Sequence, residues 1–282
     1  MTRPIFLLGV GAHKAGTSFL YRALNAHPDI RLSTPKEMHV FDSHFLPDTS
    51  ANFHRRRAEQ LADLLTKEGE QPSDHRKRKT AALLRHVRMH YDLSDYVSYF
   101  RELAEEGHLT GDITPAYQML DEAHFEAIRD LLAPHFDLRI IFLMRDPIER
   151  IFSAMRMDDR NTGRQTKLAH ERFLKTCLEP KHARRTDYSR LVQALDAVFD
   201  ADQIYYGFYE TLFEKKAFYD IGAVLNVDNL APDFETKVNA SPTLGALRKD
   251  DIAIARQQYD HVYRFCMERF GEDRIRAIWA NA

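Results

Sequence analysis

The sequence predicts an α/β fold in which a P-loop-like, mostly parallel sheet is flanked by helices on both faces. Three observations predict this fold: two continuous apolar runs typical of strands buried on both sides, a glycine-rich loop after the first run, and alternating strand and helix patterns along the chain. In such folds ligands bind beyond the carboxyl ends of the strands. The loops that follow the strands are therefore where functional residues are expected.

The apolar runs and helical periodicities give the order of elements. Residues 4–10 form an apolar run that leads through a glycine loop into a helix, and residues 138–144 repeat this pattern, with Pro147 suited to the first turn of the next helix. Two shorter runs bounded by turn residues complete the set, so strands are expected at residues 4–10, 109–113, 138–144 and 203–209. Helices are expected at about residues 17–26, 121–133, 148–157, 168–178, 187–199, 211–225 and 246–270.

The composition predicts one domain over residues 1–282. Of the 282 residues, 44% are hydrophobic, which is enough for a core, and the 29% that are charged sum to only −2, which argues against nucleic acid as a partner. The two cysteines, Cys177 and Cys266, lack ligand spacing, so we expect no disulfide framework, no metal site and a reducing compartment. No apolar stretch approaches the roughly 18 residues of a membrane helix, which favours a cytoplasmic protein without a transmembrane segment. Oligomeric state leaves no signal in the sequence.

Residues 53–90 depart from this alternation of strands and helices. They hold three basic clusters, at Arg55–Arg57, Arg76–Lys79 and Arg85–His90. One interpretation is a solvated helical insertion, because charge runs usually face water. The other is a basic rim that recruits an anionic acceptor.

The glycine loop after the first strand predicts an anion site. Its backbone N–H groups and the positive end of the following helix point at one spot and hold a phosphate there. A nucleoside-triphosphate P-loop has lysine directly after its second glycine, but here Thr17 follows Gly16 and the lysine, Lys14, lies inside the loop. Lys14 would thus contact the bridging oxygen of a phosphosulfate, with Ala15 and the Thr17 and Ser18 hydroxyls beside it.

A second anion site is expected after residue 144. Arg145 directly follows a buried strand, and Ser153 lies two turns into the next helix. A guanidinium binds phosphate through two parallel hydrogen bonds, and the serine hydroxyl adds a donor. The alternative is an arginine that merely pairs with Asp146 or Glu149.

Three segments in this order resemble the sulfotransferases that use 3′-phosphoadenosine 5′-phosphosulfate (PAPS), especially the heparan sulfate N- and 3-O-sulfotransferase branch. Residues 11–18 resemble the 5′-phosphosulfate loop, Arg145 to Ser153 the 3′-phosphate motif, and Lys36-Glu-Met-His-Val-Phe-Asp a K-E-x-H-F-F-D signature. The resemblance implies a sulfotransferase fold and transfer of a sulfuryl group, without a metal, from PAPS to a hydroxyl or amine of a small molecule, lipid or saccharide.

The resemblance also implies residue roles. Lys14 to Ser18 would hold the phosphosulfate, Arg145 and Ser153 the 3′-phosphate, and Glu37 would be the general base, with Lys36 offsetting charge and His39 in support. A carboxylate suits that task, since it takes the acceptor's proton during attack on sulfur. His13 in the loop is a second candidate base. A surface ion pair is the alternative for Lys36 and Glu37.

Three departures and two rival functions remain. The Lys-Gly-Arg loop that closes over the nucleotide in many relatives is absent, with Ser241–Gly245 and Arg248-Lys249 in that region. Val40 replaces the first aromatic residue of the K-E-x-H-F-F-D signature, and Gly111-Asp112 replaces a common Gly-Glu. A P-loop kinase is the first rival, with Asp146 as its metal ligand. A non-catalytic module that binds an anionic glycan through residues 55–90 is the second.

Overall fold

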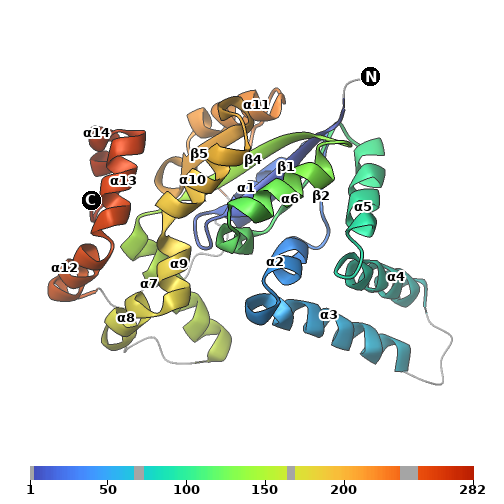
Figure 1. Cartoon of the computed structure of the whole chain (residues 1–282), viewed down its shortest axis with the longest axis horizontal. Coiled ribbons are helices and arrows are strands. Elements are labelled where there is room, and N and C mark those ends of the chain that lie inside the picture. The colour runs from blue at the N-terminus through green and yellow to red at the C-terminus, as the bar shows by residue number, and fades with distance from the viewer. Residues whose placement is uncertain (1–2, 67–72, 164–168, 236–246) are drawn as a thin grey trace.

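A five-stranded parallel sheet forms the centre of the protein (Figure 1). The computed structural model describes residues 3–66, 73–163, 169–235 and 247–282. The strand order is β2-β3-β1-β4-β5, and each neighbouring pair is parallel. The strands are β1 (Ile5–Gly11), β2 (Ile30–Leu32), β3 (Leu109–Ile113), β4 (Asp137–Met144) and β5 (Ile204–Phe208). This confirms the expected α/β fold with helices on both faces of the sheet.

Helices fill the connections between the strands. Those before β4 are α1 (Thr17–Asn25), α2 (Val40–Phe45), α3 (Pro47–Thr66), α4 (Asp74–Met89), α5 (Leu93–Glu105) and α6 (Glu122–Leu132). After β4 come α7 (Pro147–Thr162), α8 (Ala169–Leu178), α9 (Pro180–Thr186), α10 (Tyr188–Val198), α11 (Lys215–Leu225), α12 (Lys249–Gln258), α13 (Asp260–Phe270) and α14 (Glu272–Ile278). Short 3₁₀ turns lie at Pro115–Met119, Ala201–Gln203 and Tyr209–Thr211.

The two strands that carry the expected anion loops are neighbours. β1 pairs with β4 from Ile5 opposite Asp137 to Gly11 opposite Phe142, so the loop after Gly11 and the turn after Met144 leave the same edge of the sheet side by side. Both strands are buried almost throughout. Their continuous apolar sequences are therefore explained by burial on both faces.

Three expectations about the elements were wrong or incomplete. β2 was missed because it has only three residues, too few to show a periodicity. The long helix expected near 246–270 is broken at Tyr259, whose buried side chain donates a hydrogen bond to the Cys177 carbonyl at 2.5 Å; residue 246 lies outside the described residues. The helix expected from 211 begins only at Lys215, after the 3₁₀ turn that ends at Thr211.

Within residues 53–90, positions 53–66 lie on α3 and positions 74–89 on α4, and residues 67–72 lie outside the described residues. Figure 1 shows α3 and α4 on the opposite side of the sheet from α12, α13 and α14. Much of their charge is neutralised nearby. Within the described residues, ion pairs join Arg55 to Glu59, Lys77 to Asp74, Arg85 to Glu102 and Arg88 to Asp95. Across the described residues, no helix is long and apolar enough to cross a bilayer.

Candidate functional site

The loop between β1 and α1 is strongly curved. Lys14 has a φ of 73° and Gly16 a φ of 90°, both in the left-handed region. A Cβ on Gly16 would lie 2.5 Å from Cδ2 of Leu212, so only glycine fits there. The Ala15 N–H donates to the Ala12 carbonyl at 3.0 Å and closes the turn. The curvature carries the Lys14 side chain to α7, where Nζ lies 3.6 Å from Sδ of Met157.

A cavity of about 190 Å³, here named the loop crevice, opens where this loop meets α7. Seven of the expected site residues line it: Lys14, Gly16, Thr17, Ser18, Glu37, Arg145 and Ser153. His13, the second candidate base, also lines it, whereas Lys36 and His39 do not. Ala15 is fully buried and contributes its backbone to the turn rather than a side chain to the crevice. Residues from three distant parts of the sequence thus converge on one cavity.

Arg145 is bound to the loop itself. Its Nη1 donates to the Lys14 carbonyl at 3.2 Å, and its guanidinium carbon lies 4.2 Å from the centre of the Tyr209 ring. The pair with Glu149 that was the alternative is present at 3.5 Å, although that carboxylate is 42% exposed. Nε of Arg145 is buried and has no hydrogen-bond partner among the described residues. The guanidinium therefore keeps a donor for an anion in the crevice.

Asp146 is occupied in holding the fold. One carboxylate oxygen accepts from the Ile148 and Glu149 N–H groups at 2.9 and 3.2 Å and from the Tyr263 hydroxyl at 2.9 Å. The other accepts from the backbone and side-chain N–H groups of Asn281 at 3.0 and 3.1 Å. These bonds cap α7 and tie α13 and the segment after α14 to the start of α7. Both oxygens of Asp146 are therefore occupied by hydrogen bonds, so this carboxylate is not available to bind the metal ion that a kinase would need.

The Lys36–Asp42 segment forms a chain of charges that ends at the crevice. Lys36 Nζ is bonded to Oε1 of Glu37, while Oε2 of Glu37 lies 3.7 Å from Nε2 of His39. Nδ1 of His39 lies 2.9 Å from the buried carboxylate of Asp42. The ion pair proposed as the alternative for Lys36 and Glu37 is present, but it is half-buried. Lys36 and His39 contact the carboxylate of Glu37, and Glu37 in turn lines the crevice.

These contacts set the charges of the segment. Burial would raise the pKa of Glu37, but the nearby His39 ring and the Lys36 ammonium outweigh it and bring the pKa to about 2. Burial would lower the pKa of His39, yet its bond to Asp42 and the nearby Glu37 carboxylate raise it to about 9. At neutral pH, Glu37 is therefore a carboxylate and His39 a cation.

Helices α3 and α4 support this segment. The Phe53 ring of α3 stacks on the His39 ring, with centroids 3.6 Å apart and planes 10° apart. Nε2 of His86 in α4 lies 2.8 Å from the Met38 carbonyl and binds it. This support was not foreseen from the basic clusters of residues 53–90.

The crevice is electropositive. Burial is the main cause that lowers the pKa of Lys14 to about 8, followed by the positive charges of Arg160, Arg145 and Arg156. Burial also lowers the pKa of His13 to about 3, with Arg185 and Arg150 adding to the effect. Crowding of like charges around the crevice favours a multiply charged anion.

Sequence reasoning missed several residues that line the crevice. Met157 and Arg160 follow Ser153 at spacings of four and seven, so they share its face of α7, and this spacing was a usable signal. Tyr209 and Phe213 come from the segment after β5 and carried no such signal. Asp112, which replaces a common Glu, accepts from the hydroxyls of Tyr96, Thr114 and Tyr117 and is buried in the core. Residues 241–245 lie outside the described residues, and Arg248 pairs with Asp251 at 2.9 Å.

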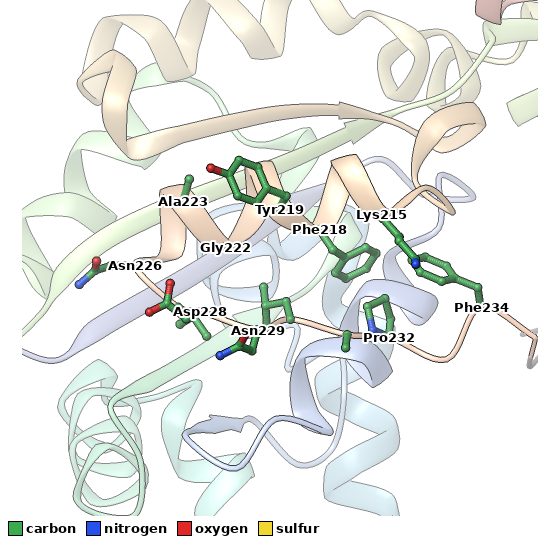
Figure 2. A pocket seen from close by; sticks show the side chains of 13 residues that line it. Lys215, Phe218, Tyr219, Gly222, Ala223, Asn226, Asp228, Asn229, Pro232 and Phe234 are labelled. Atoms are coloured by element: carbon green, nitrogen blue, oxygen red, sulfur yellow. The ribbon is translucent and has the colours of Figure 1, made fainter.

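A larger cavity, of about 900 Å³, lies elsewhere. Figure 2 shows its lining, with Tyr219 and Lys215 from α11 and Pro232 and Phe234 from the segment that follows. It shares no lining residue with the loop crevice. No group of three His, Cys, Asp or Glu side chains in the described part of the chain is placed to hold a metal ion.

Comparisons with known proteins agree with this geometry. A model described as the sulfotransferase family matches residues 4–217. A crystal structure of a sulfotransferase from Alicyclobacillus acidocaldarius has a TM-score of 0.60 and 22% identity, covering 95% of this chain and 96% of that one. The sulfotransferase domain of the Synechococcus PCC 7002 olefin synthase has a TM-score of 0.51 and 21% identity, covering 92% and 96%. No curated protein sequence matches the chain. None of these comparisons singles out the heparan sulfate branch.

Proposed function

The chain belongs to the sulfotransferase family, and from this premise we propose that it transfers a sulfuryl group from PAPS to a hydroxyl or amine of a small molecule, lipid or saccharide. One observation supports the choice of donor: two basic side chains from different loops, Lys14 and Arg145, line the same crevice. A nucleotide with a 5′-phosphosulfate and a 3′-phosphate presents two anionic groups to such a pair. The orphaned Nε of Arg145 fits this ligand.

In the proposed reaction the acceptor oxygen or nitrogen attacks sulfur in line. A bond forms between the acceptor and sulfur, and the bond from sulfur to the bridging oxygen breaks, leaving its electron pair on the 5′-phosphate of PAP, the desulfonated product. The ammonium of Lys14 stabilises the charge that grows on that oxygen, and the hydroxyls of Thr17 and Ser18 bind the phosphate. Arg145 and Ser153 hold the 3′-phosphate and fix the nucleotide in register.

The acceptor's proton goes to Glu37. With a pKa of about 2, Glu37 is fully ionised but weakly basic, so it takes the proton late, when the bond to sulfur has already made the acceptor acidic. Lys36 and His39 orient the carboxylate from behind. His13 lines the same crevice, and its low pKa keeps it neutral and able to accept a hydrogen bond.

The donor is tested by binding and by turnover. Thermal shift with PAP is compared with ATP plus magnesium; stabilisation by PAP alone supports the proposal, and stabilisation by ATP alone would overturn it. Transfer of radiolabelled sulfur from PAPS to an acceptor panel then measures activity. We expect Glu37→Gln to lower kcat by about 10²–10⁴-fold while PAP still binds. Glu59→Gln, which removes an exposed carboxylate of α3, is the matched control.

The same experiment separates the rival functions. A kinase requires ATP and a metal, which family membership and the occupied carboxylate of Asp146 disfavour. A non-catalytic glycan module would keep its function in Glu37→Gln and lose it when Arg76–Lys79 are neutralised. We further propose a single cytoplasmic domain over residues 1–282, with residues 53–90 as an insertion that braces the Lys36–Asp42 segment.

A further inference from the structure

A second cavity adjoins the loop crevice. It has a volume of about 330 Å³ and lies between α7, α8 and α9, and it is named here the α7–α9 cavity. His13 and Met157 line both cavities. Met157 also touches the ammonium of Lys14. A molecule in the α7–α9 cavity would therefore lie beside the position where the proposed function places the transferred sulfuryl group.

Cations outnumber anions in its lining. Four basic side chains, Arg172, Lys175, Lys181 and Arg185, face two acidic ones, Asp158 and Glu179. Two of the four basic side chains have acidic partners: Arg172 is bonded to the buried carboxylate of Asp159, and Lys181 lies 3.4 Å from Glu179.

The other two basic side chains, Lys175 and Arg185, have no acidic partner among the described residues. In the part of the chain that the structure describes, neither forms an ion pair, and Nε of Arg185 is buried without a hydrogen-bond partner. The charge of Asp42 acts on Arg185 through space, but Asp42 is already bonded to His39 at 2.9 Å. A half-buried guanidinium with no anion of its own is costly unless a ligand supplies one.

Two further polar atoms at the same cavity lack partners. Nδ1 of His13 and Nδ1 of His182 are both buried and unbonded among the described residues. Burial chiefly lowers the pKa of His182 to about 4, and that of His13 to about 3, so both rings are neutral near pH 7. Neutral imidazoles accept hydrogen bonds from hydroxyls as well as donating them. Buried groups of this kind normally have a partner, so the cavity is built for a polar ligand.

We propose that the α7–α9 cavity is the acceptor site and that it selects a small hydroxyl or amine compound carrying one oxyanion group, bound by Arg185 with Lys175 at the rim. Its volume lies at the lower end of small-molecule sites and suits a molecule about the size of a sugar ring. The oxyanion of the acceptor binds the guanidinium of Arg185, and its reacting hydroxyl or amine faces His13 and the loop crevice. The inference rests on the proposed sulfuryl transfer, but its binding step is separable from it.

Acceptor binding is measured by calorimetry on the full chain saturated with PAP, which blocks the two anion sites of the loop crevice. Three probes share a sugar ring: methyl glucoside is neutral, glucuronic acid carries a carboxylate and glucose 6-phosphate carries a phosphate. We expect at least one charged probe to bind about tenfold or more tightly than the neutral one. Comparing the affinities of glucuronic acid and glucose 6-phosphate shows whether the cavity prefers a carboxylate or a phosphate. Equal or tighter binding of the neutral sugar overturns the proposal.

Two variants locate the binding. Arg185→Gln should lose the preference for the charged probe, Arg185→Lys should keep part of it, and PAP affinity should stay the same in both. Arg264→Gln, which removes an exposed arginine of α13, is the matched control and should change nothing. An unchanged preference in Arg185→Gln overturns the proposal.

Failure of the proposed function looks different. If PAP itself does not bind, the probes are titrated without it, and loss of binding in Arg185→Gln but not in Arg145→Gln still assigns the anion to the α7–α9 cavity. Loss in Arg145→Gln alone assigns it to the loop crevice and overturns the inference.

Discussion

Replacing Arg145 by glutamine tests how the crevice recognises its nucleotide. The guanidinium bonds the Lys14 carbonyl, lies over the Tyr209 ring and keeps a buried, unbonded Nε. If this side chain binds the 3′-phosphate, the substitution removes charge-assisted hydrogen bonds worth about 1.5–3 kcal/mol. PAP should then bind roughly 10- to 150-fold more weakly.

The test compares two ligands on two proteins. PAP and adenosine 5′-phosphate differ by the 3′-phosphate, so the difference between their binding free energies isolates that group. Wild-type protein should prefer PAP, and Arg145→Gln should lose most of this preference while its affinity for adenosine 5′-phosphate changes by no more than about threefold. Isothermal titration calorimetry gives all four dissociation constants.

The folding stability of Arg145→Gln has to be measured together with its ligand binding. Loss of the bond to the Lys14 carbonyl and of the contact with Tyr209 should cost about 1–2 kcal/mol of folding free energy, which denaturant unfolding will register. Arg129→Gln, on the exposed side of α6, is the matched control. If Arg145→Gln weakens both ligands equally, Arg145 supports the loop rather than reading the 3′-phosphate, and the assignment is wrong.

Three other predictions concern charge and packing. Burial and nearby arginines lower the pKa of Lys14 to about 8, so PAPS affinity should fall as the pH rises through 8, and Lys14→Met should flatten this profile; a pH-independent affinity in the wild type would contradict it. In Gly111→Ala the new Cβ would lie 2.3 Å from the Leu7 carbonyl oxygen, which should cost about 1–3 kcal/mol or more in urea unfolding, whereas Gly163→Ala, with no atom within 4 Å, should cost only backbone strain; equal losses would refute the clash. Burial lowers the pKa of His86 to about 4, so between pH 6.5 and 4 the unfolded chain binds a proton at this residue that the folded chain does not bind. The free energy of unfolding should therefore fall as the pH drops from 6.5 towards 4, by about 2 kcal/mol at pH 5. If a His86→Gln variant loses stability with the same slope as the wild type, His86 is not the cause.

Local sequence was sufficient for the features that depend on neighbouring residues. β1, β3, β4 and β5 were predicted within one residue at each end. β1 and β4 were recognisable because a strand buried on both faces is continuously apolar, and β3 and β5 because turn residues bound them. The glycine loop proposed to bind an anion was recognisable because its glycines and the register of Lys14 lie within a few residues of one another. The spacing of Ser153, Met157 and Arg160 also held usable information, since one helical face repeats every three or four residues.

Other features depend on residues far apart in the chain. The helix break lies at Tyr259, whose hydroxyl binds the carbonyl of Cys177, 82 residues earlier, and no local pattern marks this contact. The bracing of His39 by Phe53 and of Met38 by His86 was hidden within a segment whose charge drew attention to its surface.

The kinds of side chain that we propose for the chemistry, and the loops that carry them, were readable from the order of amino acids, because backbone conformation and hydrophobic period are local properties. Which side chains share a cavity was decided by the tertiary structure. Glu37 lines the loop crevice, whereas Lys36 and His39 contact Glu37 but do not line it. Arg185 and His13 both line the α7–α9 cavity. Such meetings depend on long-range packing of helices and strands, whose partners lie anywhere in the chain, so burial and charge at a site are products of the tertiary structure.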